Sequence, residues 1–433
     1  MIRIATFSQD ITPPIGHPLC AGWYPPAKAI SEPLYAIGLV LIAEDMSPMV
    51  LCTLDWAELS NGDYIRWQTK LALAVGTSPD HVAVHCTHAH DTPWPDRDAQ
   101  NILDAYGWPN VIMAGDWAER ACEATSKAAM MAMVDLKPCT HFSTGESCVD
   151  RIASNRRLVG TDGKIWAMRW TRTTDPMVRA APAGVIDPLL KTIGFWHNSE
   201  PLAVVHYYAV HPISIDGTGV VNPEFVGMAR NQRSAESGVP HLYFTGCAGN
   251  VAAGKYNDGT SDNRELFARR IYNAMHAAEQ SGQLQPLKAL RWVSEPVLLP
   301  PRPDMDEEGL RSKIHSHTDK TDGKNLSRMA LMLTYLRRRE QPIHVTCLHL
   351  NAMTAILHLP GEAFIEYQLH AQEIRRDAFV AVASYGDLGT GYITLEESFT
   401  EGGYEPTDSF VSGESEQILR SAIDRVMRPK ESI

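Results

Sequence analysis

Short β-type runs alternate irregularly with amphipathic stretches along the whole chain, and this pattern constrains the fold most. Apolar or alternating runs predict strands at Leu34–Glu44, Met49–Leu54, His81–His85, Lys164–Arg172, Gly194–His197, Leu202–Val210, His241–Thr245, Thr354–Leu359 and Phe379–Ser384. A helical period predicts helices at Asp63–Ala74, Val111–Val134, Arg264–Ala278, Leu326–Arg339 and Ala363–Arg376. Irregular alternation of this kind favours a mixed α/β (α+β) fold with mixed β-sheets flanked by helices over a regular barrel.

A Pro-rich segment, Pro296–Pro303, is the main candidate for a domain boundary. The chain has 433 residues, enough for two or three average domains or for one large domain with long loops. Because predicted strands that precede polar motifs lie on both sides of this segment, we expect one catalytic domain over residues 1–433, with an insertion near 296–303.

The charge balance limits the class of partner. The chain carries 51 acidic and 39 basic residues, a formal net charge of −12, and no basic run offsets it. This charge opposes binding to nucleic acid and to anionic membranes. The longest apolar run, Ile37–Ala43, is far shorter than the roughly 20 residues that a membrane span needs. The N-terminal segment is too polar for a signal peptide. We therefore expect a soluble, cytoplasmic protein with a small-molecule substrate, without nucleic-acid binding or membrane insertion; the oligomeric state is left open.

The cysteines are scattered and form no C-x-x-C pair. They are Cys20, Cys52, Cys86, Cys122, Cys139, Cys148, Cys247 and Cys347. In a chain of this length the pattern favours reduced thiols over a disulfide framework. Cys247 raises the alternative of a cysteine nucleophile, but no histidine stands beside it in the sequence, which favours a small buried thiol.

The strongest chemical signal is the segment His85-Cys86-Thr87-His88-Ala89-His90-Asp91, directly after a β-type run. Histidines at the end of a strand stand on a loop that a metal ion or a substrate can reach. On extended backbone, His88 and His90 would point to the same side. A single histidine is more often a hydrogen-bonded core residue, but a cluster this dense favours function.

Four further candidate residues follow β-type runs or lie in Gly-rich loops. His211 ends the run Leu202–Val210, and Glu362 stands in the turn Leu359-Pro360-Gly361-Glu362. Tyr392 and Tyr404 belong to the segment that includes Gly389-Thr390-Gly391 and Gly402-Gly403. Each has a purely structural alternative: Glu362 could favour a helix N-terminus, and the tyrosines could be packing residues. Two imidazoles and a carboxylate are nevertheless the usual ligands of a hydrolytic zinc ion that keeps one position for water.

Six motifs in order resemble the catalytic N-terminal domain of the neutral/alkaline non-lysosomal ceramidases and their shorter bacterial relatives. These motifs are D-I-T-P-P (Asp10–Pro14), T-H-A-H (Thr87–His90), S-N-R (Ser154–Arg156), A-V-H (Ala209–His211), L-P-G-E (Leu359–Glu362) and G-Y-I-T…E-G-G-Y-E (Gly391–Glu405). Each is weak alone, but together they cover nearly the whole chain. The resemblance implies a neutral-ceramidase-like catalytic domain.

The resemblance also implies roles for individual residues. It implies one Zn²⁺ per chain, bound by His88, His211, Glu362 and Tyr392. It places His90, Arg156 and Tyr404 around the substrate carbonyl as catalytic residues, with Arg156 and Asn250 as substrate-binding residues. His90 and Tyr404 would donate hydrogen bonds to the oxyanion, each contributing on the order of 3 kcal/mol.

Two departures from the family pattern bear on the substrate. The family's Gly-Asp-Val-Ser stretch, whose serine has a catalytic role, is here Gly249-Asn250-Val251-Ala252. Alanine cannot act as a nucleophile, whereas a zinc-activated water does not need the serine. The chain also ends soon after Tyr404, without room for the ceramidases' C-terminal β-sandwich domain. We therefore expect a small polar substrate rather than ceramide.

These observations predict a zinc-dependent hydrolase that cleaves the amide bond of an N-acyl compound with a zinc-activated water. The alternatives left open are a zinc esterase or lactonase on a sugar-derived or other small substrate, a cysteine hydrolase, a two-metal hydrolase, and a degenerate metal-containing binding protein. The lactamase-type two-metal pattern H-x-H-x-D-H has one residue between its second histidine and its aspartate. Here Asp91 follows His90 directly, so a two-metal site is disfavoured. The general base is not assigned.

Overall fold

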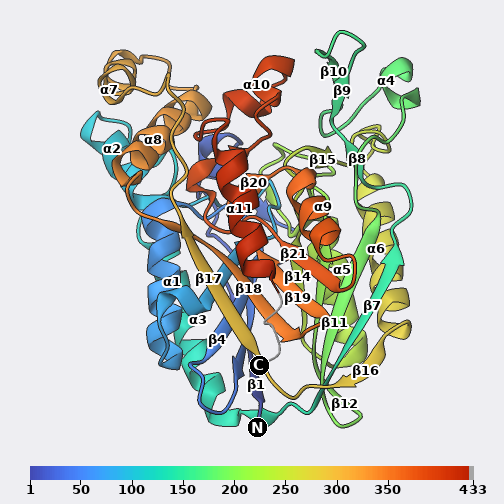
Figure 1. Cartoon of the computed structure of the whole chain (residues 1–433). Helices are drawn as coiled ribbons and strands as arrows, with labels where there is room; N and C mark the ends of the chain where they lie inside the picture. Colours follow the sequence, from blue (N-terminus) through green and yellow to red (C-terminus); the bar gives the residue numbers. More distant parts are fainter. Residues whose placement is uncertain (429–433) are drawn as a thin grey trace.

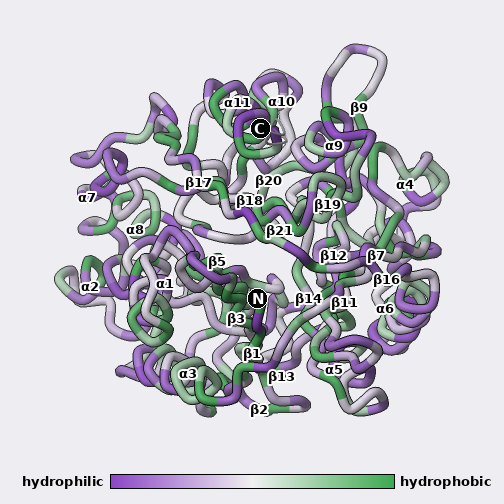
Figure 2. Tube along the Cα trace, turned by 60° about the horizontal axis from the view of Figure 1, so that its bottom comes forward, coloured by the Kyte–Doolittle hydropathy of each residue, from purple (hydrophilic) through white to green (hydrophobic). Residues whose placement is uncertain are grey.

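Three β-sheets form the centre of the protein. The structure is a computed structural model that describes residues 1–428. The first sheet has the strand order β5-β4-β3-β1-β6, the second β14-β12-β11-β7-β16, and the third β17-β18-β19-β21. Viewed from the end of the molecule opposite the loops that carry β8 and β15, the three sheets surround a common interior with helices outside them (Figure 2). The predicted fold class, mixed sheets flanked by helices, is therefore confirmed.

The strands of these sheets have the following bounds. The first sheet contains β1 (Arg3–Asp10), β3 (Tyr35–Ile42), β4 (Met49–Leu54), β5 (Val82–Cys86) and β6 (Lys137–Pro138). The second contains β7 (His141–Cys148), β11 (Leu189–His197), β12 (Glu200–Tyr208), β14 (His241–Thr245) and β16 (Gln283–Pro286). The third contains β17 (Arg291–Val297), β18 (Ile343–Asn351), β19 (Thr354–His358) and β21 (Phe379–Ala383).

Short strand pairs lie in the loops. They are β2 (Ala29–Ile30) with β13 (Val220–Val221), β8 (Ser154–Asn155) with β15 (Val251–Ala252), β9 (Arg157–Val159) with β10 (Ile165–Met168), and β20 (Glu362–Ala363) with β22 (Tyr392–Ile393). The last pair brings the predicted Glu362 and Tyr392 directly opposite each other in a parallel register.

Helices lie beside the sheets and among the loops at one end of the molecule (Figure 1). They are α1 (Asn61–Val75), α2 (Arg97–Ala105), α3 (Trp117–Ala132), α4 (Pro176–Ala180), α5 (Glu224–Ser237), α6 (Asn263–Gln280), α7 (Glu307–Ser316), α8 (Gly323–Arg338), α9 (Ile365–Ile374), α10 (Ser398–Glu401) and α11 (Ser415–Met427). Helices α1 and α3 lie on the side of the first sheet, α5 and α6 beside the second, and α9 and α11 beside the third (Figure 1). No helix in residues 1–428 is long and apolar enough to cross a membrane.

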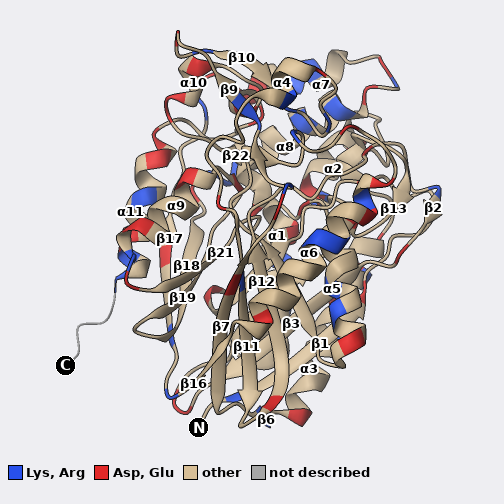
Figure 3. Cartoon of the chain, turned by 90° about the vertical axis from the view of Figure 1, so that its right-hand side faces the viewer, with Lys and Arg blue, Asp and Glu red and all other residues tan. Residues whose placement is uncertain are grey.

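The core explains why the strands read as continuous apolar runs. In β4, Val50 and Cys52 face the cluster shared with α1 and α3, while Leu51 faces the interior between the sheets. Leu242 of the second sheet and Ile356 of the third join Leu51 in that interior. A strand buried on both faces needs apolar residues at successive positions. Charged residues instead lie mostly on helices and loops, with both signs interspersed (Figure 3).

Several predicted bounds need correction. The helix expected at Val111–Val134 begins only at Trp117, because Gly115 adopts φ +61° and Gln100 Oε1 accepts the N–H groups of Ile112 and Met113 in a loop. The strand expected at Lys164–Arg172 is limited to Ile165–Met168. The helix expected at Ala363–Arg376 begins at Ile365, since Ala363 pairs with Ile393. The Pro-rich segment starts within the end of β17, and the single-domain organisation stays a prediction.

Candidate metal centre

The carboxyl ends of three parallel strand pairs meet at one place. Each sheet ends in such a pair: β4 with β5, β12 with β14, and β19 with β21. Hydrogen bonds join these ends across the sheets: Thr245 Oγ1 donates to the carbonyl of Thr87 (2.8 Å), and the Ser384 N–H donates to the carbonyl of Thr245 (2.9 Å). His88, His211 and Glu362 follow β5, β12 and β19, so residues distant in sequence converge there.

His88 is held in a strained backbone conformation. Its φ is +68°, in the left-handed region that residues other than glycine rarely adopt. Its N–H donates to the carbonyl of Trp56 (3.0 Å), and its ring Nδ1 bonds the carbonyl of Ala57 (2.8 Å). Strain of this kind clusters at functional sites. His88 and His90 do converge, but the positive φ shows that the extended backbone expected for the H-x-H segment is not the reason.

Three imidazoles meet at their Nε2 atoms. His211 Nε2 lies 2.8 Å from His88 Nε2 and 3.0 Å from His90 Nε2. Glu362 Oε2 lies 3.4 Å from His88 Nε2 and 3.7 Å from His211 Nε2. His88, His211 and Glu362 are buried, and His90 is partly accessible. His88, His211 and Glu362 therefore lie close enough to share one cation, and His90 adjoins them.

The second ring nitrogens determine what the Nε2 atoms can do. The Nδ1 atoms of His88 and His211 face the carbonyl oxygens of Ala57 and Ala248, at 2.8 and 3.3 Å, which can only accept. The Ala57 carbonyl therefore places the proton of His88 on Nδ1 and leaves its Nε2 with a lone pair. His211 Nδ1 also lies 3.3 Å from the Tyr385 hydroxyl, which can donate to it. Burial lowers the pKa of both rings well below its ordinary value, so they are neutral at pH 7. A histidine whose Nδ1 donates to a backbone carbonyl and whose Nε2 faces a cavity has the arrangement of metal-binding histidines, which is that of His88.

Two carboxyl groups lie beside the imidazoles. Burial raises the pKa of Glu362 to about 8, against the opposing effect of the Arg156 guanidinium. Burial and the neighbouring Glu362 raise the pKa of Glu58 as well. The Oε2 atom of each carboxyl group is buried and has no hydrogen-bond partner among residues 1–428. Unpartnered buried carboxylate oxygens are costly, so they too fit a site that holds a divalent cation.

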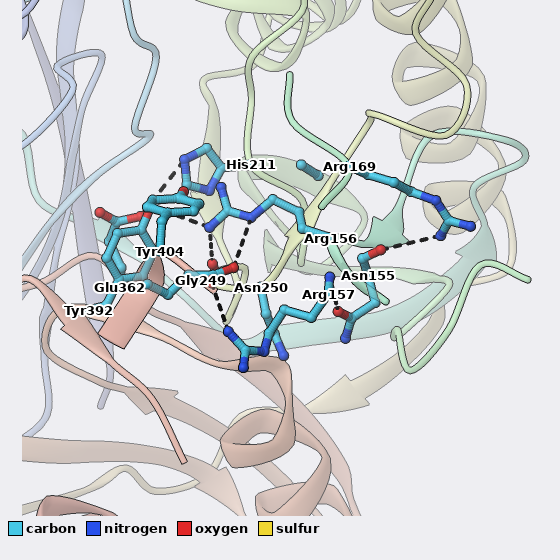
Figure 4. Close-up of polar contacts among 12 residues, drawn as sticks. Asn155, Arg156, Arg157, Arg169, His211, Gly249, Asn250, Glu362, Tyr392 and Tyr404 are labelled. Carbon is cyan, nitrogen blue, oxygen red and sulfur yellow. Dashed lines mark hydrogen bonds and ion pairs between the residues drawn. The ribbon is translucent and has the colours of Figure 1, made fainter. Parts of the chain in front are cut away.

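Arg156 connects the centre to two tyrosines (Figure 4). Its guanidinium donates to the Tyr392 hydroxyl (3.2 Å) and to the carbonyl of Gly249, and it lies 5.1 Å from the centre of the Tyr404 ring. The Tyr392 and Tyr404 hydroxyls are 2.8 Å apart. Arg156, Tyr392 and Tyr404 are thus brought together with Glu362, as the resemblance implies.

A second arginine positions the loop that carries Tyr404. Arg157 donates to Glu405 Oε2 (2.8 Å), to Glu401 Oε2 (2.9 Å) and to the carbonyl of Gly402 (2.8 Å). Glu405 is fully buried, and its other oxygen lies 3.7 Å from Arg156 Nε. This ion-pair network fixes the E-G-G-Y-E segment against the S-N-R segment.

A cavity of about 370 Å³ opens onto these groups. It is lined by the three histidines, both carboxyl groups, Arg156, Tyr392 and Tyr404, and further by Cys20, Trp23, Tyr24, Trp94, Trp170, Thr171, Ile213, Asp216, Ala252, Lys324, Gly391, Asp408 and Phe410. Ala252 lies in this lining, so the position of the family's serine faces the cavity without a hydroxyl. A volume of a few hundred Å³ suits a small ligand.

Several candidates from the sequence lie outside this cavity. Asn250 donates to Glu366 (2.9 Å) and accepts from the Ile365 N–H (2.8 Å), so its side chain positions α9 instead of lining the cavity. His85 is a core residue that bonds the Ser384 carbonyl and His358. Cys247 is fully buried and does not line the cavity. These contacts give no support to substrate binding by Asn250 or to a cysteine nucleophile.

Asp91 has a structural role. Its carboxylate accepts hydrogen bonds from the backbone N–H and side-chain hydroxyl of Thr218 and from the N–H of Gly219. It thereby anchors the loop that carries Asp216.

Sequence reasoning missed Glu58, Tyr24 and Asp216. Glu58 follows the apolar run of β4, as His211 follows β12, so its place just past a strand end was the available signal. Tyr24 and Asp216 lie in loops, and no local pattern marks them.

A second histidine cluster lies apart from this centre. The Nε2 atom of His206 and the Nδ1 atom of His241 are 2.9 Å apart, near Glu279. Their remaining ring nitrogens bond Thr192 and Ser237, and Arg233 pairs with Glu279. The groups therefore satisfy one another without a metal.

Comparison with solved structures identifies the fold. A neutral ceramidase from Pseudomonas aeruginosa has a TM-score of 0.70 to this chain at 15% identity, and a ceramidase complexed with C2 has a TM-score of 0.70 at 14% identity. Each match covers 100% of this chain and 76% of the other. The fold is that of neutral ceramidase. The resemblance inferred from six motifs is thus confirmed for the ceramidase fold. No protein-family model matches the chain, and no curated protein does so at a significant level.

Proposed function

We propose that this chain is a zinc-dependent hydrolase that cleaves the amide bond of a small, polar N-acyl compound. The observation that carries the proposal is the convergence of three imidazole Nε2 atoms and the Glu362 carboxylate in one cavity. Nitrogen and carboxylate ligands of this kind are those of catalytic zinc sites. The ceramidase fold supports amide hydrolysis in particular.

The predicted ligands are His88, His211, Glu362 and Tyr392, holding one zinc ion per chain. When bound, zinc would lower the pKa of a water molecule toward about 7 and polarise the substrate carbonyl. Burial raises the pKa of the Tyr392 phenol well above its ordinary value, so without a cation this residue is a neutral phenol.

The chain's own residues would complete the chemistry. Tyr404 O–H lines the cavity and would donate to the oxyanion that forms when water attacks the carbonyl. The guanidinium of Arg156 would stabilise the same developing charge. Glu58 has a buried oxygen free of partners within the described chain, so it would accept the proton of the attacking water.

The lining of the cavity supports a small polar substrate. Lys324, Asp216 and Arg156 place charges of both signs around it, while three tryptophans provide flat apolar surface. Polar groups set among aromatic side chains bind ligands that combine hydrogen-bonding groups with apolar faces. The Ala252 side chain supplies no nucleophile, which supports attack by water.

A substrate screen tests this proposal. The purified protein is assayed against N-acyl amino acids, N-acyl sugars, simple esters and lactones, with and without a zinc chelator and then with zinc restored. We expect hydrolysis of at least one N-acyl compound, abolished by chelation and recovered with zinc. Cleavage only of esters or lactones would show that the enzyme hydrolyses an ester bond and not an amide bond. Activity that survives chelation but is lost with iodoacetamide would refute the zinc mechanism.

A further inference from the structure

We infer that Lys324 is a substrate-binding residue, and that the N-acyl compound hydrolysed by this protein carries a carboxylate that pairs with its ammonium group. The inference rests on the proposed function and names the class of substrate, an anionic N-acyl compound. Lys324 lines the same cavity as the histidines and carboxyl groups of the candidate metal centre. One small molecule in this cavity can therefore contact both the lysine and the centre.

The first turn of α8 fixes where Lys324 enters the cavity wall. Helix α8 begins at Gly323, next to Lys324. A Cβ atom at Gly323 would lie 2.7 Å from the carbonyl oxygen of Gly22, so a larger residue there would push the helix away from the loop that carries Trp23. The close approach of the two backbones therefore sets the position of Lys324 relative to Trp23.

Trp23 orients the lysine side chain. Lys324 and Ser327 are three positions apart, so they lie on the same side of α8. Ser327 Oγ accepts a hydrogen bond from Trp23 Nε1 (3.1 Å), and Lys324 Nζ lies 4.3 Å from the centre of the Trp23 ring. A cation over the face of an indole is attracted by the ring electrons. This contact restricts the side chain and leaves N–H donors of the ammonium available to an anion.

The acidic residues in the cavity wall have other partners. Asp408 pairs with Arg328 (2.8 Å), and Asp216 accepts a hydrogen bond from the Tyr24 hydroxyl (3.1 Å). Within residues 1–428, no ion pair or hydrogen bond joins the Lys324 ammonium to another group. An unpaired ammonium in the wall of a binding cavity is suited to a negatively charged ligand.

The other cation of the cavity wall is already engaged. The guanidinium of Arg156 donates to the Tyr392 hydroxyl and to the carbonyl of Gly249, and Glu405 lies beside it. Lys324 is therefore the better candidate for recognising a charged group of the substrate, at a different part of the wall from the carbonyl-binding groups.

The charges around Lys324 favour a carboxylate over a phosphate. One ammonium group compensates a single negative charge. A phosphate dianion would bring a second negative charge into a cavity that also contains Asp216 and Asp408, and like charges repel. A cavity of about 370 Å³ has room for a small N-acyl compound with one carboxylate.

The test uses three amides that differ in the position of a carboxylate. N-acetylleucine carries it on the amine side, N-isopentylsuccinamic acid carries it on the acyl side, and N-isopentylacetamide lacks it. Titration calorimetry of the zinc-loaded protein measures both binding and hydrolysis, because binding gives a discrete heat at each injection and turnover gives a continuous one.

The variants separate charge from size. Lys324→Met keeps the length of the side chain without its charge, and Lys324→Arg keeps the charge. Lys320→Met is the matched control, because it removes an exposed positive charge that does not line the cavity. Lys324 is itself exposed, so its replacement should leave the fold intact, which thermal melting checks.

We expect the wild type to bind one of the two acids about 10-fold more tightly than N-isopentylacetamide, because a hydrogen bond to a charged group is stronger than one to a neutral group. The acid that binds more tightly shows on which side of the amide the carboxylate lies. Lys324→Met should lose this preference, whereas Lys324→Arg and Lys320→Met should retain it. Equal affinity for all three compounds, no binding of either acid, or an unchanged preference in Lys324→Met would overturn the inference.

The outcomes also distinguish this inference from the proposed function. If the wild type prefers an acid through Lys324 but hydrolyses no N-acyl compound, the carboxylate site stands and the hydrolase function is wrong. If the wild type hydrolyses N-isopentylacetamide as readily as either acid, the function stands and the inference is wrong.

Discussion

The carboxyl group of Glu58 contacts that of Glu362 in the interior, so the candidate centre contains two adjacent acids, not one. The loop after β4 supplies the first and the turn after β19 supplies the second. Two carboxylates cannot remain ionised in contact unless a proton or a cation compensates their charge. Burial raises the pKa of both groups, and the contact with Glu362 raises that of Glu58 further, so a cation beside them would stabilise the fold.

Replacing Glu58 by glutamine should lower kcat by about 10²- to 10⁴-fold, because the variant loses the acceptor for the proton of water. The same variant should be more stable than the wild type when metal-free, since one of the two adjacent acids is gone. Activity assays on the zinc-loaded variant and melting curves in chelator measure the two effects. An active variant, or one that melts lower without metal, would contradict the role given to Glu58.

The stability of the metal-free protein should fall as pH rises from about 4.5 to about 8. Unfolded Glu362 ionises near its ordinary pKa of 4.5, whereas in the folded protein it stays protonated up to about 8. Between these values the folded state holds a proton that the unfolded state has released, so rising pH favours unfolding by up to about 1.4 kcal/mol per pH unit. Urea unfolding at several pH values, compared with Glu362→Gln, isolates this contribution. If the free energy of unfolding fell equally steeply with pH in the wild type and in Glu362→Gln, Glu362 would not be the source of the pH dependence.

Removing the hydroxyl of Tyr404 should slow the reaction without removing the metal. Tyr404→Phe loses a donor to the oxyanion, for which we expect a decrease in kcat of about 10²- to 10³-fold with zinc content unchanged. Tyr106→Phe is the matched control, because its hydroxyl bonds Arg311 and is remote from the cavity. If both variants keep full activity, Tyr404 has no part in the chemistry.

Much of the fold follows from local pattern, and part of the site does not. The runs Met49–Leu54 and His241–Thr245 become β4 and β14 with the predicted bounds, because a strand buried on both faces has a strong local signature. The strands β7 and β17 were missed, since polar residues such as Glu146 and Glu295 interrupt their apolar positions.

Local sequence also predicts only part of the candidate site. His88 and His211 stand just past apolar runs, a signal that local sequence carries. Their Nδ1 atoms contact the backbone carbonyls of Ala57 and Ala248, which no side-chain pattern reveals. Tyr24 and Asp216 are 192 positions apart and meet only in the folded chain.

A buried ion pair should contribute strongly to stability. Arg230 forms two hydrogen bonds with Asp55 (2.6 and 2.8 Å), and both side chains are fully buried. Arg230→Ala leaves the Asp55 charge uncompensated and should cost about 3–5 kcal/mol in the free energy of unfolding. Arg120→Ala, which removes an exposed pair with Asp116, should change stability far less. Urea denaturation measures the free energy of unfolding of both variants. Equal losses of stability in Arg230→Ala and Arg120→Ala would show that burial of the ion pair is unimportant.

The metal content of the purified protein tests the central claim most directly. Elemental analysis of wild type and of His211→Ala, each dialysed against metal-free buffer, should give about one zinc ion per wild-type chain and almost none in the variant. Two ions per wild-type chain would indicate a two-metal hydrolase. No bound ion, or equal zinc in both proteins, would contradict a zinc centre at the junction of the three sheets.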